Sequence, residues 1–494
     1  MDLAIALDPQ SVIPLYRQLY EELRRAILTG RLPPKHQIPS TRALSHSLGI
    51  SRSTVTLSYD QLLSEGYLET VVGSGTFVCA ELPDDLLHPH PVEPTSDKPS
   101  PAIALSAYGK NLAAPALNRP VNSTTEITFG YGCPALDHFP MEVWRKLMAR
   151  HCRYQLELLN YAPDSGGYLP LRQAIAHYLA RIRAVQCDPQ QVVIVNGSQQ
   201  ALDLVTRLLV DRGDRVVLEN PGYLGARRVF LAYGATLHPV PVDQRGLIVK
   251  SLETVTDAKL IYVTPSHQFP TGAVLSLPRR LELLTWAHKT GALILEDDYD
   301  SEYRYGGRLQ NSQDNHPLPA LQGLDQSHSV VYIGTFSKVL FPALRIGYLV
   351  VPPTLVKLVI QAKWLSDRQS PLLEQAVLTD FINEGYLERH IRRMRTLYDQ
   401  RRQVLVHALT SHFGDQLTIL GERAGIHLMA RLHTSLSDTE ILQRAAQVGV
   451  GITSAYPCYL TDNHEAELIF GYAELTEAQI NEGVQRLAQV LLTP

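Results

Sequence analysis

A lysine between two apolar runs is the first candidate for chemistry in this sequence. Lys338 lies in the stretch GTFSKVLFPALRIGY, residues 334–348, between apolar runs at 330–333 and 349–351, and Arg345 follows it in the same stretch. Burial removes water from an amine and lowers its pKa, so that a neutral nitrogen can attack an aldehyde. Lys338 is therefore a candidate Schiff-base lysine. The alternative is a surface lysine on a loop between a strand and a helix.

Short apolar runs alternate with helical segments in the C-terminal part of the chain. They lie at 192–195, 215–219, 259–264, 292–297 and 329–334. Buried runs with helices between them are typical of a mostly parallel sheet with crossover helices. Ligands of such sheets bind at the carboxyl ends of the strands, so the polar residues that follow each run are the next candidates.

Polar side chains follow three of these runs. Ser198 and Gln199 open a helix after the first run, where backbone N–H groups could hold a phosphate, although many such turns are glycine and serine for geometric reasons. Tyr223 follows the second run and could stack on an aromatic ring; a buried core tyrosine is an equal alternative. The acidic segment EDDYD, residues 296–300, lies at the end of the fourth run, and such a cluster is costly unless a cation or a proton donor is near.

These residues together predict a site for pyridoxal 5′-phosphate. Lys338 would form the imine, and Asp297 would bind the protonated ring nitrogen. Tyr223 would stack on the ring, and Arg345 would complete a phosphate cup as a charge-assisted donor.

Composition and charge limit the class of protein. The chain has 494 residues, of which 45% are apolar and 19% charged, and a net charge of −4, which indicates a globular protein of two or three units. No apolar run is long enough for a signal peptide or a membrane span, and five widely spaced cysteines predict neither disulfides nor a metal site, so a reducing cytoplasm is expected. Residues 23–59 include six basic residues and no acidic one, which predicts a polyanion-binding face.

Three helices are predicted around this basic segment. The first spans residues 14–30, the second follows the N-cap candidate Ser40 and ends at Gly49, and the third begins at Ser51. The second and third form a helix-turn-helix, whose second helix enters the major groove by its N-terminal residues. Alternating strands on either side of residues 73–75 add a β-hairpin. The alternative is an ordinary helical hairpin.

This region resembles the winged helix-turn-helix of the GntR family. The likeness covers about residues 14–78 and rests on PLYRQLYEELRRAILTGRL, IPSTRALSHSLGISRSTVTLSYDQLLSEGYLE and GSGTFV. It implies a double-stranded DNA operator as partner. The recognition helix and the resemblance together give as DNA-binding candidates Arg42, Ser51, Arg52, Ser53, Thr54 and Gly75.

The rest of the chain resembles the fold-type I aminotransferase superfamily, through GSQQAL, ENPGYLGARRVF, TPSHQFPTG, EDDYDSEYRY and TFSKVLFPALRIGY. This implies the fold class that we expect: a mostly parallel sheet with helices on both faces, plus a smaller α+β domain. Together with the GntR-type head, the whole chain is similar to the MocR family of bacterial transcriptional regulators. Carried over by motif, the cofactor-binding residues are Lys338, Asp297, Tyr299, Tyr223, Ser198, Gln199, Arg345, Thr335 and Tyr161. The resemblance implies that Tyr299 bonds the ring hydroxyl and that Tyr161 reaches the phosphate in the partner subunit's site.

Three residues depart from the aminotransferase pattern. Phe269 stands where an asparagine usually bonds the ring hydroxyl, and Ile469 aligns with the arginine that clamps a substrate carboxylate. Gly225 stands where GABA-responsive regulators of the MocR family carry an arginine. Because a guanidinium is needed to hold a carboxylate bidentately, efficient transamination is not expected unless the fold brings Arg423 or Arg431 into the site.

These observations predict a DNA-binding domain at 12–80, a proline-rich linker at 81–120 and an effector domain at 121–494. A homodimer without a membrane partner is expected. The predicted function is a transcriptional regulator that senses pyridoxal phosphate itself and controls vitamin B6 synthesis. The alternatives are a regulator that responds to an amino acid or amine such as GABA, taurine or a D-alanyl compound, a working aminotransferase, and a structural helix-turn-helix dimer with an empty pocket.

Overall fold

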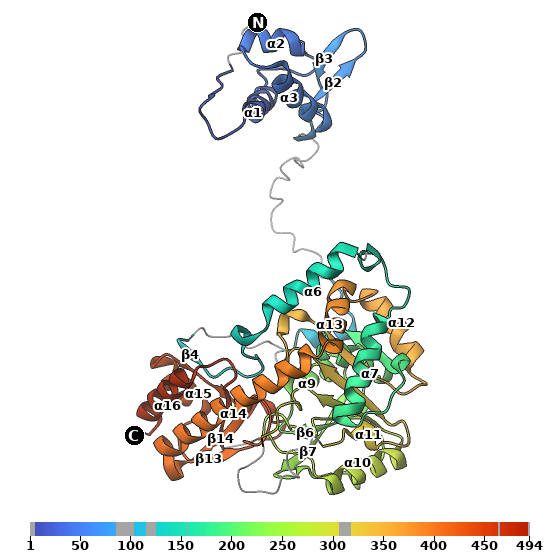
Figure 1. The fold of residues 1–494 in the computed structure, drawn as a ribbon, viewed down its shortest axis with the longest axis vertical. Coiled ribbons are helices and arrows are strands. Elements are labelled where there is room, and N and C mark those ends of the chain that lie inside the picture. The colour runs from blue at the N-terminus through green and yellow to red at the C-terminus, as the bar shows by residue number, and fades with distance from the viewer. Residues whose placement is uncertain are drawn as a thin grey trace. The chain divides into compact units, whose positions relative to one another are not determined.

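The computed structural model describes residues 5–84, 103–114, 125–154, 156–305, 318–462 and 465–492. The chain divides into two compact units, residues 1–104 and 105–494 (Figure 1). In the described residues, no helix has the length and apolar character that a membrane span requires.

The first unit is a winged helix-turn-helix. Its elements are α1 (Leu15–Leu28), β1 (Gln37–Ile38), α2 (Thr41–Leu48), α3 (Arg52–Ser64), β2 (Leu68–Val71) and β3 (Gly75–Val78). Ser40 and Ser51 cap α2 and α3 with their side chains, and Gly49 ends α2 in the left-handed conformation. The strands pair in the order β1-β3-β2. The three predicted helices and the hairpin are confirmed, whereas β1 is too short to show a periodic pattern in the sequence.

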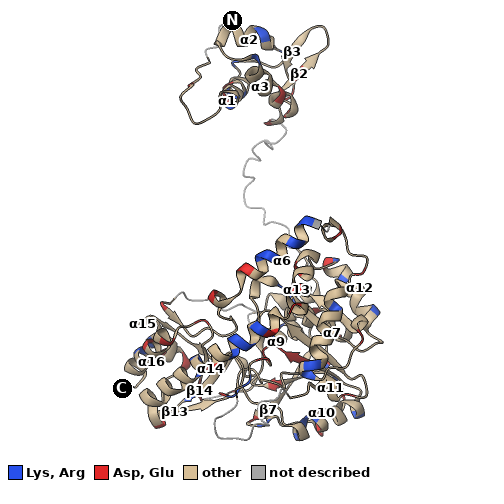
Figure 2. Cartoon of the chain, in the orientation of Figure 1, with Lys and Arg blue, Asp and Glu red and all other residues tan. Residues whose placement is uncertain are grey.

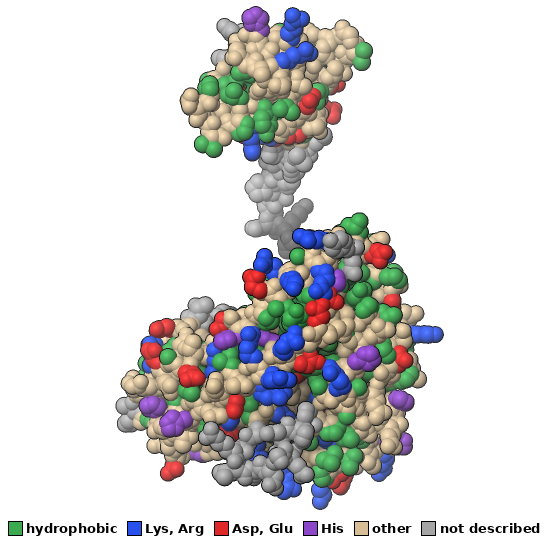
Figure 3. Space-filling model, in the orientation of Figure 1, with side chains coloured by type: hydrophobic (Ala, Val, Ile, Leu, Met, Phe, Trp, Pro, Cys, Tyr) green, Lys and Arg blue, Asp and Glu red, His purple; other side chains and the backbone are tan. Residues whose placement is uncertain are grey.

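The apolar faces of the three helices meet in one core. Leu19 and Leu23 of α1, Leu44 of α2, and Val55 and Leu62 of α3 are almost completely buried together. This burial leaves the start of α3 at the surface. Basic side chains lie at the end of the unit where α2 runs (Figures 2 and 3).

An eight-stranded sheet forms the centre of the second unit, in the order β5-β12-β11-β10-β9-β6-β7-β8. The strands are β5 (Val192–Val195), β6 (Arg215–Asn220), β7 (Thr236–Asp243), β8 (Gly246–Leu247), β9 (Ala258–Val263), β10 (Leu293–Asp298), β11 (Val330–Thr335) and β12 (Gly347–Val350). Strands β11, β10, β9, β6 and β7 are parallel neighbours, while β12 is antiparallel to β11 and β5, and β8 to β7. The predicted mostly parallel sheet is confirmed.

Helices cover both faces of this sheet (Figure 1). Helices α8 (Ser198–Leu209), α9 (Leu224–Ala232) and α12 (Val356–Asp367) pack on one face, and α6 (Met141–Tyr154), α7 (Leu169–Arg183), α10 (Leu277–Thr290) and α13 (Leu372–Asn383) on the other. Successive strand residues point to opposite faces: Val193 and Val195 pack with the first group, Val192 and Ile194 with the second. This double cover explains the continuous apolar runs of the sequence. The short α11 (Leu321–Leu324) precedes β11.

A smaller α+β part is built on the 28-residue helix α14 (Tyr386–Phe413) and the segments that follow it, together with β4 (Ile127–Thr128). Its sheet has the order β13 (Leu417–Leu420), β14 (His427–Leu432), β17 (Ala466–Gly471), β16 (Thr453–Ser454). The remaining elements are α15 (Asp438–Gln447), α16 (Glu477–Leu491) and β15 (Val450–Gly451), which pairs in parallel with β4. Leu405, Leu428, Leu468 and Val484 are buried in its core. The predicted smaller domain is confirmed.

One part of the predicted linker is folded. Helix α5 (Ala107–Leu112) belongs to the second unit. Asn111 donates a hydrogen bond to the Ala232 carbonyl oxygen at 3.0 Å, and the rings of Tyr108 and Tyr233 lie 5.0 Å apart. An N-cap bond from Gly109 to Ser106 and these contacts with α9 hold the helix. Residues 85–102 and 115–120 of the predicted linker lie outside the described residues.

Candidate functional site

Eight of the nine predicted cofactor-binding side chains line a single cavity. The cavity, of about 190 Å³, lies where parallel strands of the large sheet end, beside the start of β14. The eight are Ser198, Gln199, Tyr223, Asp297, Tyr299, Thr335, Lys338 and Arg345. The ninth, Tyr161, is 66% exposed and lies outside this lining.

Lys338 lies in the turn between β11 and β12. Its Nζ donates a hydrogen bond to the Gly132 carbonyl oxygen at 2.6 Å. Burial lowers the pKa of Lys338 below its usual value, although the nearby acidic groups oppose the shift. A Cβ at Gly132 would lie 2.9 Å from Nζ, so that a side chain there would crowd the amine. A buried lysine with a lowered pKa is suited to attack an aldehyde near neutral pH.

Asp297, on β10, lines the cavity and has one carboxylate oxygen that is unpaired in the described chain. The Tyr262 hydroxyl donates to its Oδ2 at 2.7 Å, while Oδ1 is buried without a hydrogen-bond partner among the described residues. Burial raises the pKa of this carboxyl to about 7. A buried oxygen without a hydrogen bond costs free energy until a donor binds to it. The N–H of a protonated pyridine ring is such a donor.

The other carboxylates of the 296–300 segment have separate partners. Glu296 accepts two backbone N–H groups at the start of α11, and the buried guanidinium of Arg183 donates to Asp298 at 2.8 Å. Both carboxylate oxygens of Asp300 lie 3.0 Å from Nδ1 of His267. These partners explain how the chain tolerates the acidic cluster, and they leave Asp297 as the carboxylate of the segment that lines the cavity.

Donors for an anion gather at the N-terminus of α8. Ser198 and Gln199 are its first residues, after Gly197 with a φ of 86°. Nη2 of Arg345 donates to the Asn196 carbonyl oxygen at 2.6 Å, and a Cβ at Gly197 would lie 2.9 Å from that nitrogen. Backbone N–H groups at a helix start and a guanidinium together form a phosphate site.

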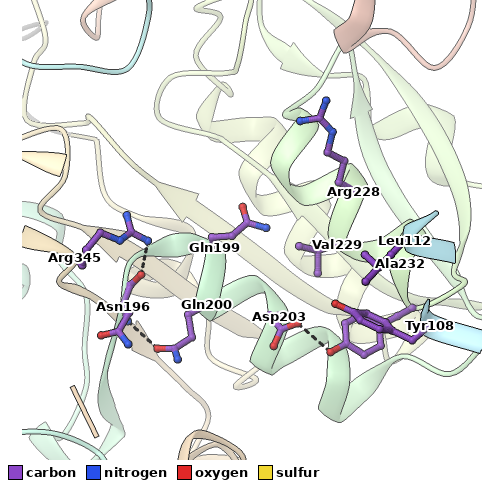
Figure 4. Close-up of a pocket in the computed structure, with 11 residues that line it drawn as sticks. Tyr108, Leu112, Asn196, Gln199, Gln200, Asp203, Arg228, Val229, Ala232 and Arg345 are labelled. Carbon is purple, nitrogen blue, oxygen red and sulfur yellow. Dashed lines mark hydrogen bonds between the residues drawn. The ribbon is translucent and has the colours of Figure 1, made fainter. Parts of the chain in front are cut away.

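A second cavity, of about 480 Å³, lies beside these candidate anion donors (Figure 4). Gln199 and Arg345 line both cavities. Figure 4 shows Arg345 at one side of the second cavity, and Tyr108 and Leu112 of α5 at the other. Helix α5 therefore shares a cavity with the proposed phosphate donors.

The two predicted ring contacts have different surroundings. Tyr223 precedes α9, and its ring meets that of Phe269 edge-on at 5.7 Å. The Tyr299 hydroxyl donates to the His267 carbonyl oxygen at 2.8 Å. Because its proton is used there, Tyr299 would accept, rather than donate, a bond from a cofactor hydroxyl.

Several cavity residues are absent from the sequence-based prediction. They are Tyr131, Gly132, Tyr262, Thr264, Ser337, Pro342, Ile426 and His427. Tyr262 and Thr264 stand at the end of the run at 259–264, a position at which strand-end reasoning could have found them. Tyr131 follows β4, and His427 begins β14 of the smaller sheet. The pattern of parallel strands therefore does not predict that they line the cavity.

The three departures from the aminotransferase pattern lie in or beside the cavity. Ile469 is fully buried in a cluster with Phe269. A Cβ at Gly225 would lie 2.4 Å from the Tyr223 ring, so a longer side chain there would need that ring to move. Among the described residues, Arg345 is the one arginine that lines the cavity, and neither Arg423 nor Arg431 does.

Tyr161 lies on an exposed apolar patch. The Arg368 guanidinium sits 4.3 Å from the centre of its ring. This apolar patch consists of Leu156, Leu159, Tyr161, Trp364 and Leu365, which are 79%, 75%, 66%, 51% and 74% exposed. Because large exposed apolar patches are often contact surfaces, this patch is a candidate contact surface.

His267, Asp300 and His427 form the one His, Cys, Asp or Glu group in the described chain whose spacing could hold a metal ion, with ligand atoms within 4.8 Å of one another. No metal site is predicted from the sequence. Nδ1 of His267 lies at hydrogen-bond distance from Asp300, so this nitrogen is used in a hydrogen bond. We therefore interpret the group as a hydrogen-bonded His267–Asp300 pair beside His427.

The predicted DNA-binding residues lie on the first unit, at the start of α3, on α2 and in the hairpin. All but the half-buried Thr54 are exposed: Arg42, Ser51, Arg52, Ser53 and Gly75. Arg52 Nε lies 3.4 Å from the Thr41 hydroxyl that it faces. Gly75 has a φ of 122°, and a Cβ there would lie 2.6 Å from Nε2 of Gln37, so the hairpin tip requires glycine.

Comparison with known proteins covers both units. Residues 15–78 match the gntR family of bacterial regulatory proteins, and residues 124–487 match aminotransferase class I and II. The probable rhizopine catabolism regulatory protein MocR of Rhizobium meliloti is 42% identical, over 99% of this chain and 96% of that protein. The chain belongs to the MocR family. A MocR-family chain of this build is a transcriptional regulator with a DNA-binding head and an aminotransferase-like domain.

Two further relatives of this MocR-family chain bear on its ligand. The HTH-type pyridoxine biosynthesis transcriptional regulator PdxR of Corynebacterium glutamicum is 30% identical over 96% of both chains. The α-aminoadipate aminotransferase LysN of Thermus thermophilus, solved with N-(5′-phosphopyridoxyl)-L-leucine, has a TM-score of 0.70 and 31% identity over 78% of this chain and 97% of that one. The effector domain therefore has the fold of aminotransferases that use pyridoxal phosphate.

Proposed function

We propose that this protein is a pyridoxal phosphate-binding regulator that binds a double-stranded DNA operator and controls pyridoxal phosphate synthesis genes in response to pyridoxal phosphate. The bare Oδ1 of Asp297 carries the proposal, because it lies in the cavity that also holds the amine of Lys338. The likeness to a pyridoxine biosynthesis regulator supports the choice of target genes.

Each residue has a distinct role in this proposal. When bound, pyridoxal phosphate supplies an aldehyde that condenses with amines. Lys338 holds the cofactor covalently, Asp297 accepts the ring N–H, and the Tyr223 ring packs on the cofactor ring. The phosphate is held by Ser198, Gln199, Thr335 and Arg345.

The site favours regulation over transamination. Turnover of an amino acid needs a cation for its α-carboxylate, and the described cavity has its arginine at the proposed phosphate end. Regulators that respond to an amino acid or amine, and working aminotransferases, remain the competing candidates. An amino acid effector or substrate requires a carboxylate site.

The protein is proposed to act as a cytoplasmic homodimer. The apolar patch around Tyr161 would be covered by a second copy, and the hydroxyl of Tyr161 would then reach the phosphate end of its partner's cavity. A two-fold dimer also presents two heads to paired operator half-sites.

DNA binding with and without cofactor tests this function. The full chain is titrated onto DNA from upstream of its own gene, with pyridoxal phosphate, with GABA, taurine or alanine, and with both. A change in operator affinity on adding pyridoxal phosphate alone is expected. Affinity that changes only with an amino acid contradicts the cofactor-sensing proposal, and a cofactor spectrum that amino acids convert catalytically indicates an enzyme.

A further inference from the structure

A histidine with a bare nitrogen lines the cofactor cavity. His427 begins β14, is 2% exposed, and lines the same cavity as Lys338. Its Nε2 has no hydrogen-bond partner among the described residues. Buried polar atoms in folded proteins are nearly always paired, so an unpaired nitrogen in a cavity wall indicates a position for a ligand group.

The backbone beside His427 determines what that nitrogen can do. Burial lowers the pKa of His427 well below its usual value, His267 adds to the shift, and the backbone of Pro270 opposes it. Proline has no backbone N–H, so the Pro270 group that faces the ring is its carbonyl oxygen, toward which the ring directs its N–H. With its proton on Nδ1 and the ring neutral, Nε2 keeps a lone pair that only accepts. A ligand group facing it must bring a hydrogen-bond donor.

The surroundings of His427 exclude a carboxylate for a second reason. The rings of His267, Phe269 and Tyr131 lie 4.7, 5.4 and 6.3 Å from that of His427. His267 is held by Asp300, and Lys338, whose charge acts on His427, is the residue that would hold the cofactor. A carboxylate here would lose its water without gaining a charged partner, which is costly, and it would face a lone pair.

We propose that this cavity binds a primary amine that carries a hydroxyl in the place of an amino acid's carboxylate, and that His427 accepts the hydrogen bond of that hydroxyl. The ligand carries an amine because the aldehyde of the cofactor condenses with amines. The inference rests on cofactor binding as proposed above and goes beyond it, because it gives the site a second ligand.

Two small molecules of one skeleton test the ligand class. L-Alaninol and L-alanine differ only in bearing a hydroxymethyl or a carboxylate group. The full chain is loaded with pyridoxal phosphate, its visible spectrum is recorded, and each compound is titrated with EDTA present, with thermal stability as a second readout. Alaninol should bind at least about tenfold more tightly than alanine, because alanine lacks the hydroxyl that would contact His427, and the loss of one favourable contact readily gives such a ratio.

Variants of His427 test the contact itself. His427→Phe keeps a ring but removes both nitrogens, and should weaken alaninol about tenfold, measured on chain whose visible spectrum shows that the cofactor is bound. His427→Asn offers an amide oxygen as acceptor and should restore part of the affinity. Equal binding of alaninol and alanine to the wild-type chain overturns the inference whether or not the variants fold. So does unchanged alaninol binding by His427→Phe.

The cofactor spectrum, which is recorded before any amine is added, separates this inference from the proposed function. A wild-type chain that takes up no pyridoxal phosphate contradicts both. A chain that takes it up but binds neither amine contradicts this inference alone.

Discussion

The hydroxyl of Tyr262 binds one carboxylate oxygen of Asp297 and leaves the other unpaired in the described part of the chain. It donates to Oδ2 at 2.7 Å, and Oδ1 is left without a partner among the described residues. Tyr262 is itself buried on β9, which runs parallel to β10 and pairs Tyr262 with Leu295. The aspartate is therefore oriented by a neighbouring strand before a ligand arrives, and this preorganisation lowers the cost of binding.

The raised pKa of Asp297 predicts a pH dependence of stability in the cofactor-free chain. Burial raises it from 3.8 to about 7, so the folded state holds the proton more tightly than the unfolded state. The free energy of unfolding should then fall as the pH rises through this interval. Asp297→Asn cannot ionise and should show a shallower fall between pH 5 and pH 7.5, about one to a few kcal/mol less, measured by urea denaturation.

The same pair of chains provides the cofactor test. Glu219 and Glu296 have pKa values raised to about 7 by burial, so some pH dependence should remain in Asp297→Asn. This variant should bind pyridoxal phosphate more weakly by about 1.5 to 3 kcal/mol, the range for a hydrogen bond to a charged group. Identical pH slopes in the two chains would show that Asp297 does not hold a proton in this way.

Lys338→Ala is expected to abolish covalent cofactor binding. Lys338 is the lysine that lines the cavity, whereas Lys250, Lys289 and Lys357 are exposed. The variant should lose the visible absorbance of the bound cofactor, and Lys289→Ala is a matched control that should keep it. Borohydride reduction and peptide mapping check the assignment directly, and a label on another lysine would disprove it.

Much of this site could be predicted from the positions of polar residues at the ends of apolar runs, because these positions are visible in the sequence. Lys338 and Asp297 follow apolar runs, and the sheet brings the ends of those runs together, as expected for parallel strands. The N-cap residues Ser40 and Ser51 likewise indicated where α2 and α3 begin. These features depend on neighbours along the chain, which the sequence displays.

The rest of the site depends on packing between distant segments. His427 comes from the smaller sheet and meets His267 with ring centres 4.7 Å apart, a contact that no spacing in the sequence indicates. The partner of Asp298 is Arg183, on α7. Helix α5 also escaped prediction, because it is short and its contacts with α9 are tertiary.

Arg52→Ala tests the recognition helix. The side chain is exposed at the start of α3 and faces the hydroxyl of Thr41. Loss of a base contact should lower operator affinity by about 1 to 3 kcal/mol and relax sequence preference, whereas loss of a phosphate contact should weaken all DNA equally and reduce the salt dependence. Arg17→Ala, on the exposed face of α1, is a suitable control. Unchanged operator binding by Arg52→Ala at moderate salt would remove Arg52 from the interface.

The apolar patch predicts that a charge placed on it weakens the dimer. Leu365 is 74% exposed, and Leu365→Glu should place a charge in the proposed dimer interface and shift sedimentation toward the monomer. A charge buried in such an interface without a partner is costly. Leu281→Glu, at a 50% exposed position on α10, is the matched control and should leave the dimer intact.

Tyr161→Phe separates the shared site from simple dimerisation. It keeps the ring that lies beneath Arg368 and removes only the hydroxyl, so the dimer should persist. If the hydroxyl reaches the partner's phosphate, cofactor affinity should fall by about 1.5 to 3 kcal/mol. Tyr456→Phe, at a 50% exposed tyrosine outside the patch, should leave it unchanged. A monomer that keeps full cofactor affinity, or a Tyr161→Phe chain that binds as wild type, would mean that each subunit builds its phosphate site alone.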